Sequence, residues 1–152
     1  MPDVSFTTLI PSTGDSERIL LAKLRAPCTS GTALASAART VTTLSSTLGS
    51  RGYKGIIVYV NVTAASGTGG LTTRLVGVDP LSGVTALNAA VVGAITAIGL
   101  RIYHFGPGVG PLANAGLGGS AAGVYLGSQF QIQVIHGDTS SYTYSVSYEL
   151  IP

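Results

Sequence analysis

The residues best suited to chemistry lie close together near the end of the chain, in a short polar segment. His136, Asp138, Ser140 and Ser141 follow one another within a few positions. A histidine base, a carboxylate and a serine are the groups of a Ser-His-Asp hydrolase. In such a site the serine must reach the histidine, the acid must lie behind the histidine, and oxyanion donors must be near. Whether these groups can meet depends on the elements on either side.

On both sides of this segment apolar and polar residues alternate, which is the pattern of a β-strand. The residues that share a face are Phe130, Ile132, Val134 and His136 before the segment, and Tyr142, Tyr144, Val146, Tyr148 and Leu150 after it. The turn formers GDTSS lie between them, and Gly137 could supply a positive φ. The pattern predicts a hairpin, in which His136 and Asp138 point away from each other. Because the sequence also contains no G-x-S-x-G elbow, we expect no catalytic residues and no enzyme activity.

Metal and cofactor sites find little support in the sequence. His104 and His136 each stand alone among apolar neighbours, and the single cysteine, Cys28, has no ligand spacing around it. The run from Gly116 to Ala121 loosely matches the dinucleotide fingerprint G-x-G-x-x-G/A. That fingerprint requires a helix after the glycines, whereas VYLGSQFQIQV follows here and resembles a strand. The sequence therefore predicts neither a bound metal nor a cofactor.

Charged residues are scarce, at 9% of the chain compared with about 25% in a typical globular protein. The net charge is +2 and no basic run or stripe is visible, so we expect no nucleic-acid partner. The longest apolar stretch, from Ala89 to Leu100, is too short to span a bilayer, and we expect no membrane partner. Because soluble monomers use charge to resist association, other subunits are expected to cover much of this surface.

The elements that must position these residues are strands, because alternation with period two recurs along the chain. The segments concerned are residues 39–48, 55–63, 71–80, which ends in the turn residues Asp79-Pro80, and 99–105. Segment 84–98 is ambiguous between helix and strand, and its neighbours favour a strand. Residues 106–123, rich in glycine, are predicted to form a long loop. Short strands with glycine-rich turns predict an all-β fold, a single β-sandwich of the jelly-roll type over residues 37–152.

Residues 1–36 differ from this body and are predicted to form an extended N-terminal arm. They contain three of the prolines and one apolar cluster, ILLAKLRA. The cluster fits a short helix that is capped by Asp15 or Ser16 and ended by Pro27, and it fits a strand equally well. We expect the arm to become ordered on a partner. The apolar residues expected to anchor it are Ile19, Leu20, Leu21 and Leu24.

Four segments of the body carry a resemblance to a known family: LASAARTVTTLSST (34–47), GYKGIIVYVNVTA (52–64), LVGVDPLSG (75–83) and FQIQVIHGDTSSYTYSVSYELI (130–151). They occur in the same order in a family of small tailed-bacteriophage structural proteins, which resembles capsid decoration, or cement, proteins. The resemblance covers residues 34–152. It consists of strand and turn patterns, and the family has no active-site residues to transfer to this chain.

The resemblance implies a virion structural protein that binds the outside of the major capsid protein shell and stabilises it. It also implies a homo-oligomer, commonly a trimer, that is made in the host cytoplasm and located on the capsid surface. One alternative is a tail- or fibre-associated β-sandwich module, which could bind carbohydrate through Tyr142, Tyr144 and Tyr148. The other is a hydrolase that uses His136 and Asp138.

Overall fold

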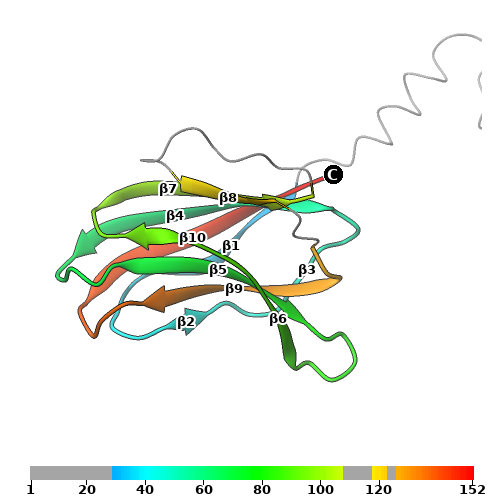
Figure 1. Ribbon diagram of the computed structural model, residues 1–152, viewed down its shortest axis with the longest axis horizontal. Coiled ribbons are helices and arrows are strands. Elements are labelled where there is room, and N and C mark those ends of the chain that lie inside the picture. Colours follow the sequence, from blue (N-terminus) through cyan, green and yellow to red (C-terminus); the bar gives the residue numbers. More distant parts are fainter. Residues whose placement is uncertain (1–28, 108–117, 123–125) are drawn as a thin grey trace, which may run out of the picture.

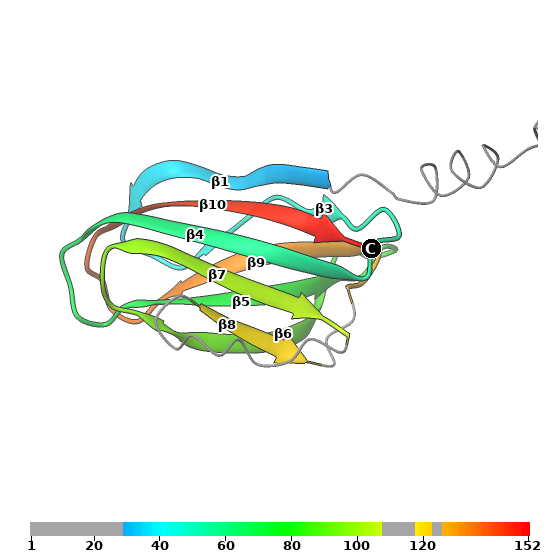
Figure 2. The ribbon, with the colours of Figure 1, turned by 90° about the horizontal axis from the view of Figure 1, so that it is seen from above.

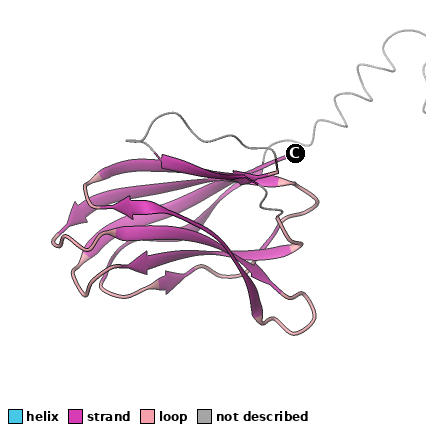
Figure 3. Cartoon of the chain, in the orientation of Figure 1, coloured by secondary structure: helices cyan, strands magenta, loops and turns pink. Residues whose placement is uncertain are grey.

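The computed structural model describes residues 29–107, 118–122 and 126–152 of the chain. In this part of the chain ten β-strands form two sheets that stack face to face, and no helix is present (Figures 1 and 3). The predicted all-β sandwich is therefore confirmed. None of the described segments is a helix with the length and apolarity that a membrane crossing requires.

The first sheet holds five strands in the spatial order β1-β10-β4-β7-β8, and Figure 2 looks onto it from above. The bounds of these strands are Thr29–Arg39 for β1, Gly55–Ala65 for β4, Gly99–Gly106 for β7, Gly118–Ala122 for β8 and Tyr142–Ile151 for β10. Neighbouring strands are antiparallel, except for β7 and β8, which are parallel. The edges of this sheet are β1 and β8.

The second sheet has the order β2-β9-β5-β6, and the short strand β3 also pairs with β9. The bounds are Thr43–Leu44 for β2, Leu48–Gly49 for β3, Leu71–Val78 for β5, Thr85–Ile95 for β6 and Gln129–His136 for β9. All pairs in this sheet are antiparallel. Segment 84–98 therefore forms a strand, β6, as predicted.

The pairs are nested along the chain like the two arms of one long hairpin. β1 pairs with β10, β2 and β3 with β9, β4 with β7, and β5 with β6. This long hairpin is then wound on itself, so that β10 also pairs with β4 and β9 with β5. Most strand partners are consequently far apart in sequence, and successive strands often lie in different sheets.

The core lies between the sheets and follows from the alternation seen in the sequence. In β4 the residues predicted to share a face are all buried, and none of them exceeds 2% exposure: Ile56, Val58, Val60 and Val62. The opposing strand β9 contributes Phe130, Ile132 and Val134, and β10 contributes Tyr142, Tyr144, Val146 and Leu150. Each such side chain stabilises the fold by about 1.5–3 kcal/mol through burial.

The predicted boundary between arm and body, at residues 36 and 37, falls inside β1. Residues 29–36 belong to the first sheet, where Thr29 pairs with Leu150 and Leu34 with Val146. Alternation does not predict this strand from the sequence TSGTALASAAR, because most of its side chains are small and its register shifts twice along β10. Residues 1–28, which include most of the predicted arm, lie outside the described residues.

Two further predictions need correction. Segment 39–48 is not one strand, because it holds the end of β1, all of β2 and the start of β3, and residues 45–47 separate β2 from β3. Ser45 bonds to Ile132 twice: its backbone N–H donates to the Ile132 carbonyl (2.9 Å), and its Oγ accepts from the Ile132 N–H (3.0 Å). The glycine-rich loop predicted over 106–123 contains β8 at residues 118–122, while 108–117 and 123–125 lie outside the described residues.

Candidate functional site

The polar segment between β9 and β10 joins the two sheets, because β9 pairs with β5 and β10 pairs with β4 and β1. The predicted hairpin is therefore wrong, and residues 137–141 form an arch, the name used for them below. Five extended residues span about 16–18 Å, more than the roughly 10 Å between stacked sheets. Turn-forming residues indicate that a chain reverses. They do not indicate whether the two strands then pair with each other.

The arch is fixed to the loop before β5. The Asp138 carboxylate accepts hydrogen bonds from the N–H groups of Gly69 (2.8 Å) and Ser140 (3.0 Å), which lower the pKa of Asp138. The Gly137 N–H donates to the Gly70 carbonyl at 2.9 Å. A Cβ atom on Gly137 would overlap the Gly69 carbonyl oxygen, so glycine is required there for close approach rather than for the positive φ that was predicted.

His136 makes several contacts that Asp138 does not share. The Nε2 atom of His136 lies 3.4 Å from the Tyr144 hydroxyl, and its ring meets the Tyr142 ring edge-on with centroids 5.4 Å apart. The backbone N–H of His136 donates to the Thr42 hydroxyl. Burial lowers the pKa of His136, and the backbone of Ser140 and the nearby charge of Asp138 offset only part of this effect. The histidine and the acid that a hydrolase would use are thus both engaged in structural contacts.

Stability should fall as the pH falls through the titration of His136. Because burial lowers its pKa below the unfolded value of 6.5, the unfolded chain takes up a proton there before the folded chain does. The contribution of neutral His136 to stability is fully present above the unfolded pKa. It is lost completely once the pH falls below the pKa of His136 in the folded protein. Thermal unfolding between about pH 7.5 and about pH 5.5 measures this effect. In the His136→Gln variant, stability should change less with pH over this range. If it changed as steeply as in the wild type, the pH dependence would not come from His136.

The remaining candidates from the sequence are distributed as follows. Tyr142 and Tyr144 are fully buried, and Tyr148 packs against the core with part of its surface exposed. Of the loose dinucleotide match, residues 118–121 lie in strand β8 rather than in a helix, and residues 116 and 117 lie outside the described residues. Within the described ranges, no three His, Cys, Asp or Glu side chains gather as they would to hold a metal ion. The predicted anchor, Ile19, Leu20, Leu21 and Leu24, lies outside the described residues.

The turn between β5 and β6, Asp79–Val84, presents an exposed apolar group on a fixed frame, and we call it the tip. Leu81 is 96% exposed and Val84 is 62% exposed. The Asp79 carboxylate accepts from the Ser82 hydroxyl (2.5 Å) and the Leu81 N–H (3.0 Å), and these two bonds lower the pKa of Asp79. Its backbone exchanges bonds with Gly83 and Val84, and Gly83 adopts φ 71°. The tip is therefore ordered before any partner binds.

A shallow pocket of about 190 Å³ lies at the start of β4, and we call it the basic pocket. It is lined by Arg51, Gly52, Tyr53, Lys54 and Pro152. Arg51 and Gly52 have positive φ values of 52° and 85°, and the Tyr53 N–H donates to the Ser50 carbonyl at 3.0 Å, which makes a tight turn. The described residues contain no ion pair to Arg51 or Lys54.

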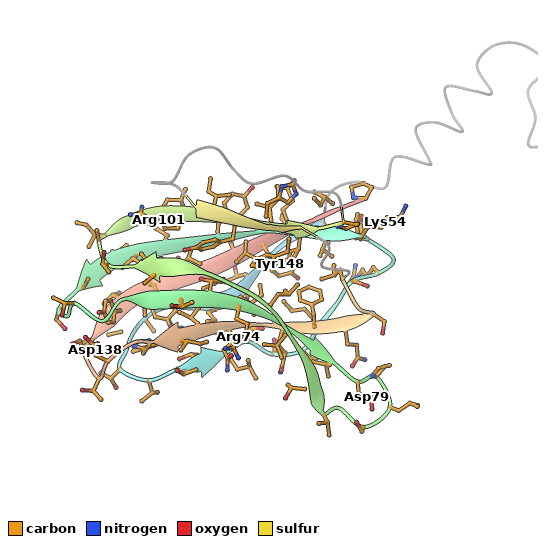
Figure 4. The ribbon with its side chains drawn as sticks, in the orientation of Figure 1. Lys54, Arg74, Asp79, Arg101, Asp138 and Tyr148 are labelled. Atoms are coloured by element: carbon orange, nitrogen blue, oxygen red, sulfur yellow. The ribbon has the colours of Figure 1, made fainter. Side chains whose placement is uncertain are left out.

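The tip and the basic pocket lie at the same end of the sandwich, on different sheets. At the start of β9, Gln129 pairs with Gly49 on one side and with Val78 on the other. The turn that bears Arg51 follows Gly49, and the tip follows Val78. Figure 4 shows Lys54 and Asp79 at this end, with Asp138 of the arch at the opposite end.

Only part of this arrangement could be predicted from the sequence. Asp79-Pro80 followed by Ser82-Gly83 predicted the turn, which is confirmed, but nothing in the pattern assigned it a role. The basic pocket depends on the fold, because it joins residues 51–54 to Pro152. No protein-family model, no curated protein and no solved structure matches the chain.

Proposed function

We propose that the protein is a virion structural protein of a tailed bacteriophage, a capsid decoration or cement protein. In this role it binds the outside of the major capsid protein shell and stabilises the shell. The observation that best supports a binding role is the placement of exposed apolar side chains. In the described ranges the exposed large ones are Val41, Leu44, Leu81, Val84, Ile98 and Leu100, and the most exposed of them, Leu81, shares a turn with Val84.

The sparse charge of the body favours the same conclusion. Only five charged residues follow position 54: Arg74, Asp79, Arg101, Asp138 and Glu149. Asp79 and Asp138 each accept backbone N–H bonds in turns of their own chain. Exposed charge pairs contribute only about 0–1 kcal/mol each, whereas apolar burial contributes about 25 cal/mol per Å². Attachment through apolar and backbone contacts is therefore the larger available source of affinity.

The arm supplies the second part of the proposal. β1 is an edge strand held by a ladder to β10, and residues 1–28 precede it directly. A segment that starts at a firmly paired strand can reach a neighbouring subunit while the body stays folded. We propose that Ile19, Leu20, Leu21 and Leu24 anchor this arm on the major capsid protein. Strand addition by such an arm provides backbone hydrogen bonds, and its apolar side chains fill pockets.

Two finer features belong to the same proposal. The nested order of strand pairs, wound so that β10 meets β4 and β9 meets β5, supports assignment of the sandwich as a jelly roll with an added strand, β8. The protein is proposed to act as a homo-oligomer, a trimer, at the capsid surface. The tail- or fibre-associated alternative loses part of its basis, because Tyr142 and Tyr144 are fully buried and cannot stack on a sugar.

Counting the copies of the protein in purified virions tests the proposal. A decoration protein covers the whole shell, so its copy number should be comparable with that of the major capsid protein. Quantitative mass spectrometry with isotope-labelled peptides of both proteins gives this ratio directly. A tail or fibre component would occur in far fewer copies, and such a count would refute the decoration role.

A further inference from the structure

The tip offers an apolar side chain on a backbone that hydrogen bonds already hold in place. Leu81 is 96% exposed, although the turn beneath it is tied by the hydrogen bonds of Asp79. A group that is ordered before binding loses little conformational entropy when it binds. Solvent-exposed leucines are common, but a leucine at the apex of a hydrogen-bonded turn is suited to insertion into a complementary pocket.

The basic pocket offers a site of matching size and opposite charge. An apolar cavity of about 150 Å³ admits benzene, so a pocket of about 190 Å³ has room for a leucine side chain. Tyr53 and Pro152 give it apolar walls, and Arg51 and Lys54 place two cations at its margin. The tip carries the carboxylate of Asp79 two positions before Leu81. Size and charge therefore match between these two surfaces.

The tip cannot enter the pocket of its own chain. Almost the whole surface of Leu81 is open, and the tip and the pocket continue from different strands on either side of β9. Their location at one end of the body does allow contact between copies. In a twofold dimer or a threefold trimer, the neighbours of each copy all lie towards the symmetry axis. A contact of one surface with a different surface closes into a ring under such symmetry.

We infer that copies of this chain associate by inserting Leu81 of one tip into the basic pocket of a second copy, with Asp79 facing Arg51 and Lys54. The contact deepens the proposed function, because it identifies the surfaces that build the homo-oligomer. It places the start of β1 near this contact, since the Tyr53 hydroxyl beside the pocket lies 3.2 Å from the Thr29 Oγ1.

Sedimentation velocity of the full chain over a range of concentrations tests this contact, with reductant present because of Cys28. Leu81→Ser disables the tip, and Arg51→Asn with Lys54→Gln disables the pocket; asparagine tolerates the positive φ at residue 51. Each variant should weaken self-association by roughly tenfold or more. Ile98→Ser is the matched control, because Ile98 is 64% exposed at the opposite end, and it should associate like the wild type.

Mixing the two variants gives the sharpest result. A tip-disabled chain retains its pocket and a pocket-disabled chain retains its tip, so the mixture can form one intact contact and should recover association that neither variant shows alone. A wild-type chain that stays monomeric, or variants that associate like the wild type, would overturn the inference. Neither outcome bears on the copy number in virions, so failure here is distinguishable from failure of the decoration role.

Discussion

Replacing Tyr142 by alanine is expected to lower the free energy of unfolding by about 3–5 kcal/mol, the usual cost of removing a buried aromatic side chain. Tyr142 is fully buried, and it lies in β10 directly after the arch. Its hydroxyl accepts the Gly70 N–H at 2.8 Å, and its ring supports His136. Domains of this size are stable by about 5–15 kcal/mol, so this one change would remove a large part of the total.

Tyr142→Phe separates the hydroxyl from the ring. The variant leaves the buried Gly70 N–H without its partner, which costs about 1–3 kcal/mol. Tyr59→Phe is the matched control, because its hydroxyl donates to Glu149 on the outer face of the first sheet and should contribute about 0.5 kcal/mol or less. Urea unfolding of the three variants measures these differences. Equal effects of the two phenylalanine substitutions would show that the Gly70 bond does not stabilise the arch.

Alternation was sufficient to predict the strands whose two faces differ in polarity. Ile56 to Thr63 in β4 and Phe130 to His136 in β9 have this character, and their inward residues are those that the pattern grouped together. β1 escaped prediction because its alternation is carried by alanine, serine and glycine. Small side chains differ little in burial, and the backbone ladder to β10 keeps this strand in place.

The pairing of the strands could not be predicted from local pattern. A hairpin and an arch both need a polar turn, and the segment after His136 supplies one in either case. The difference lies in distant partners: β9 finds β5, and β10 finds β4 and β1. The requirement for Gly137 likewise arises from the approach of the Gly69 backbone, which no residue near position 137 reveals.

The two candidate binding surfaces also differ in whether they depend on local sequence or on the fold. The tip is local, since its residues are contiguous and Asp79 bonds within its own turn. The basic pocket is not local, because the last strand must return beside β4 to bring Pro152 next to Tyr53. A sequence pattern can therefore indicate that Leu81 is exposed, but only the fold shows that the basic pocket lies at the same end.

Deleting the arm is expected to weaken attachment to the shell by about tenfold to a thousandfold while the body stays folded. The deletion should remove residues 1–28, because a cut at 33 would also remove the part of β1 that pairs Thr29 with Leu150. Four anchor side chains contribute about 1.5–3 kcal/mol each when buried. Ordering a segment on binding takes back about 2–5 kcal/mol or more, so a substantial net loss remains.

A full-length chain with Ile19, Leu20, Leu21 and Leu24 all replaced by serine separates the anchor from the rest of the arm and should lose affinity similarly. Titration of each protein onto undecorated capsids measures the loss, and undiminished affinity of the truncated chain would refute the anchor. Because exposed charges are screened and apolar burial is not, wild-type affinity should change little between roughly 0.05 and 0.5 M salt. A steep decline would instead assign attachment to the basic residues of the arm, Arg18, Lys23 and Arg25.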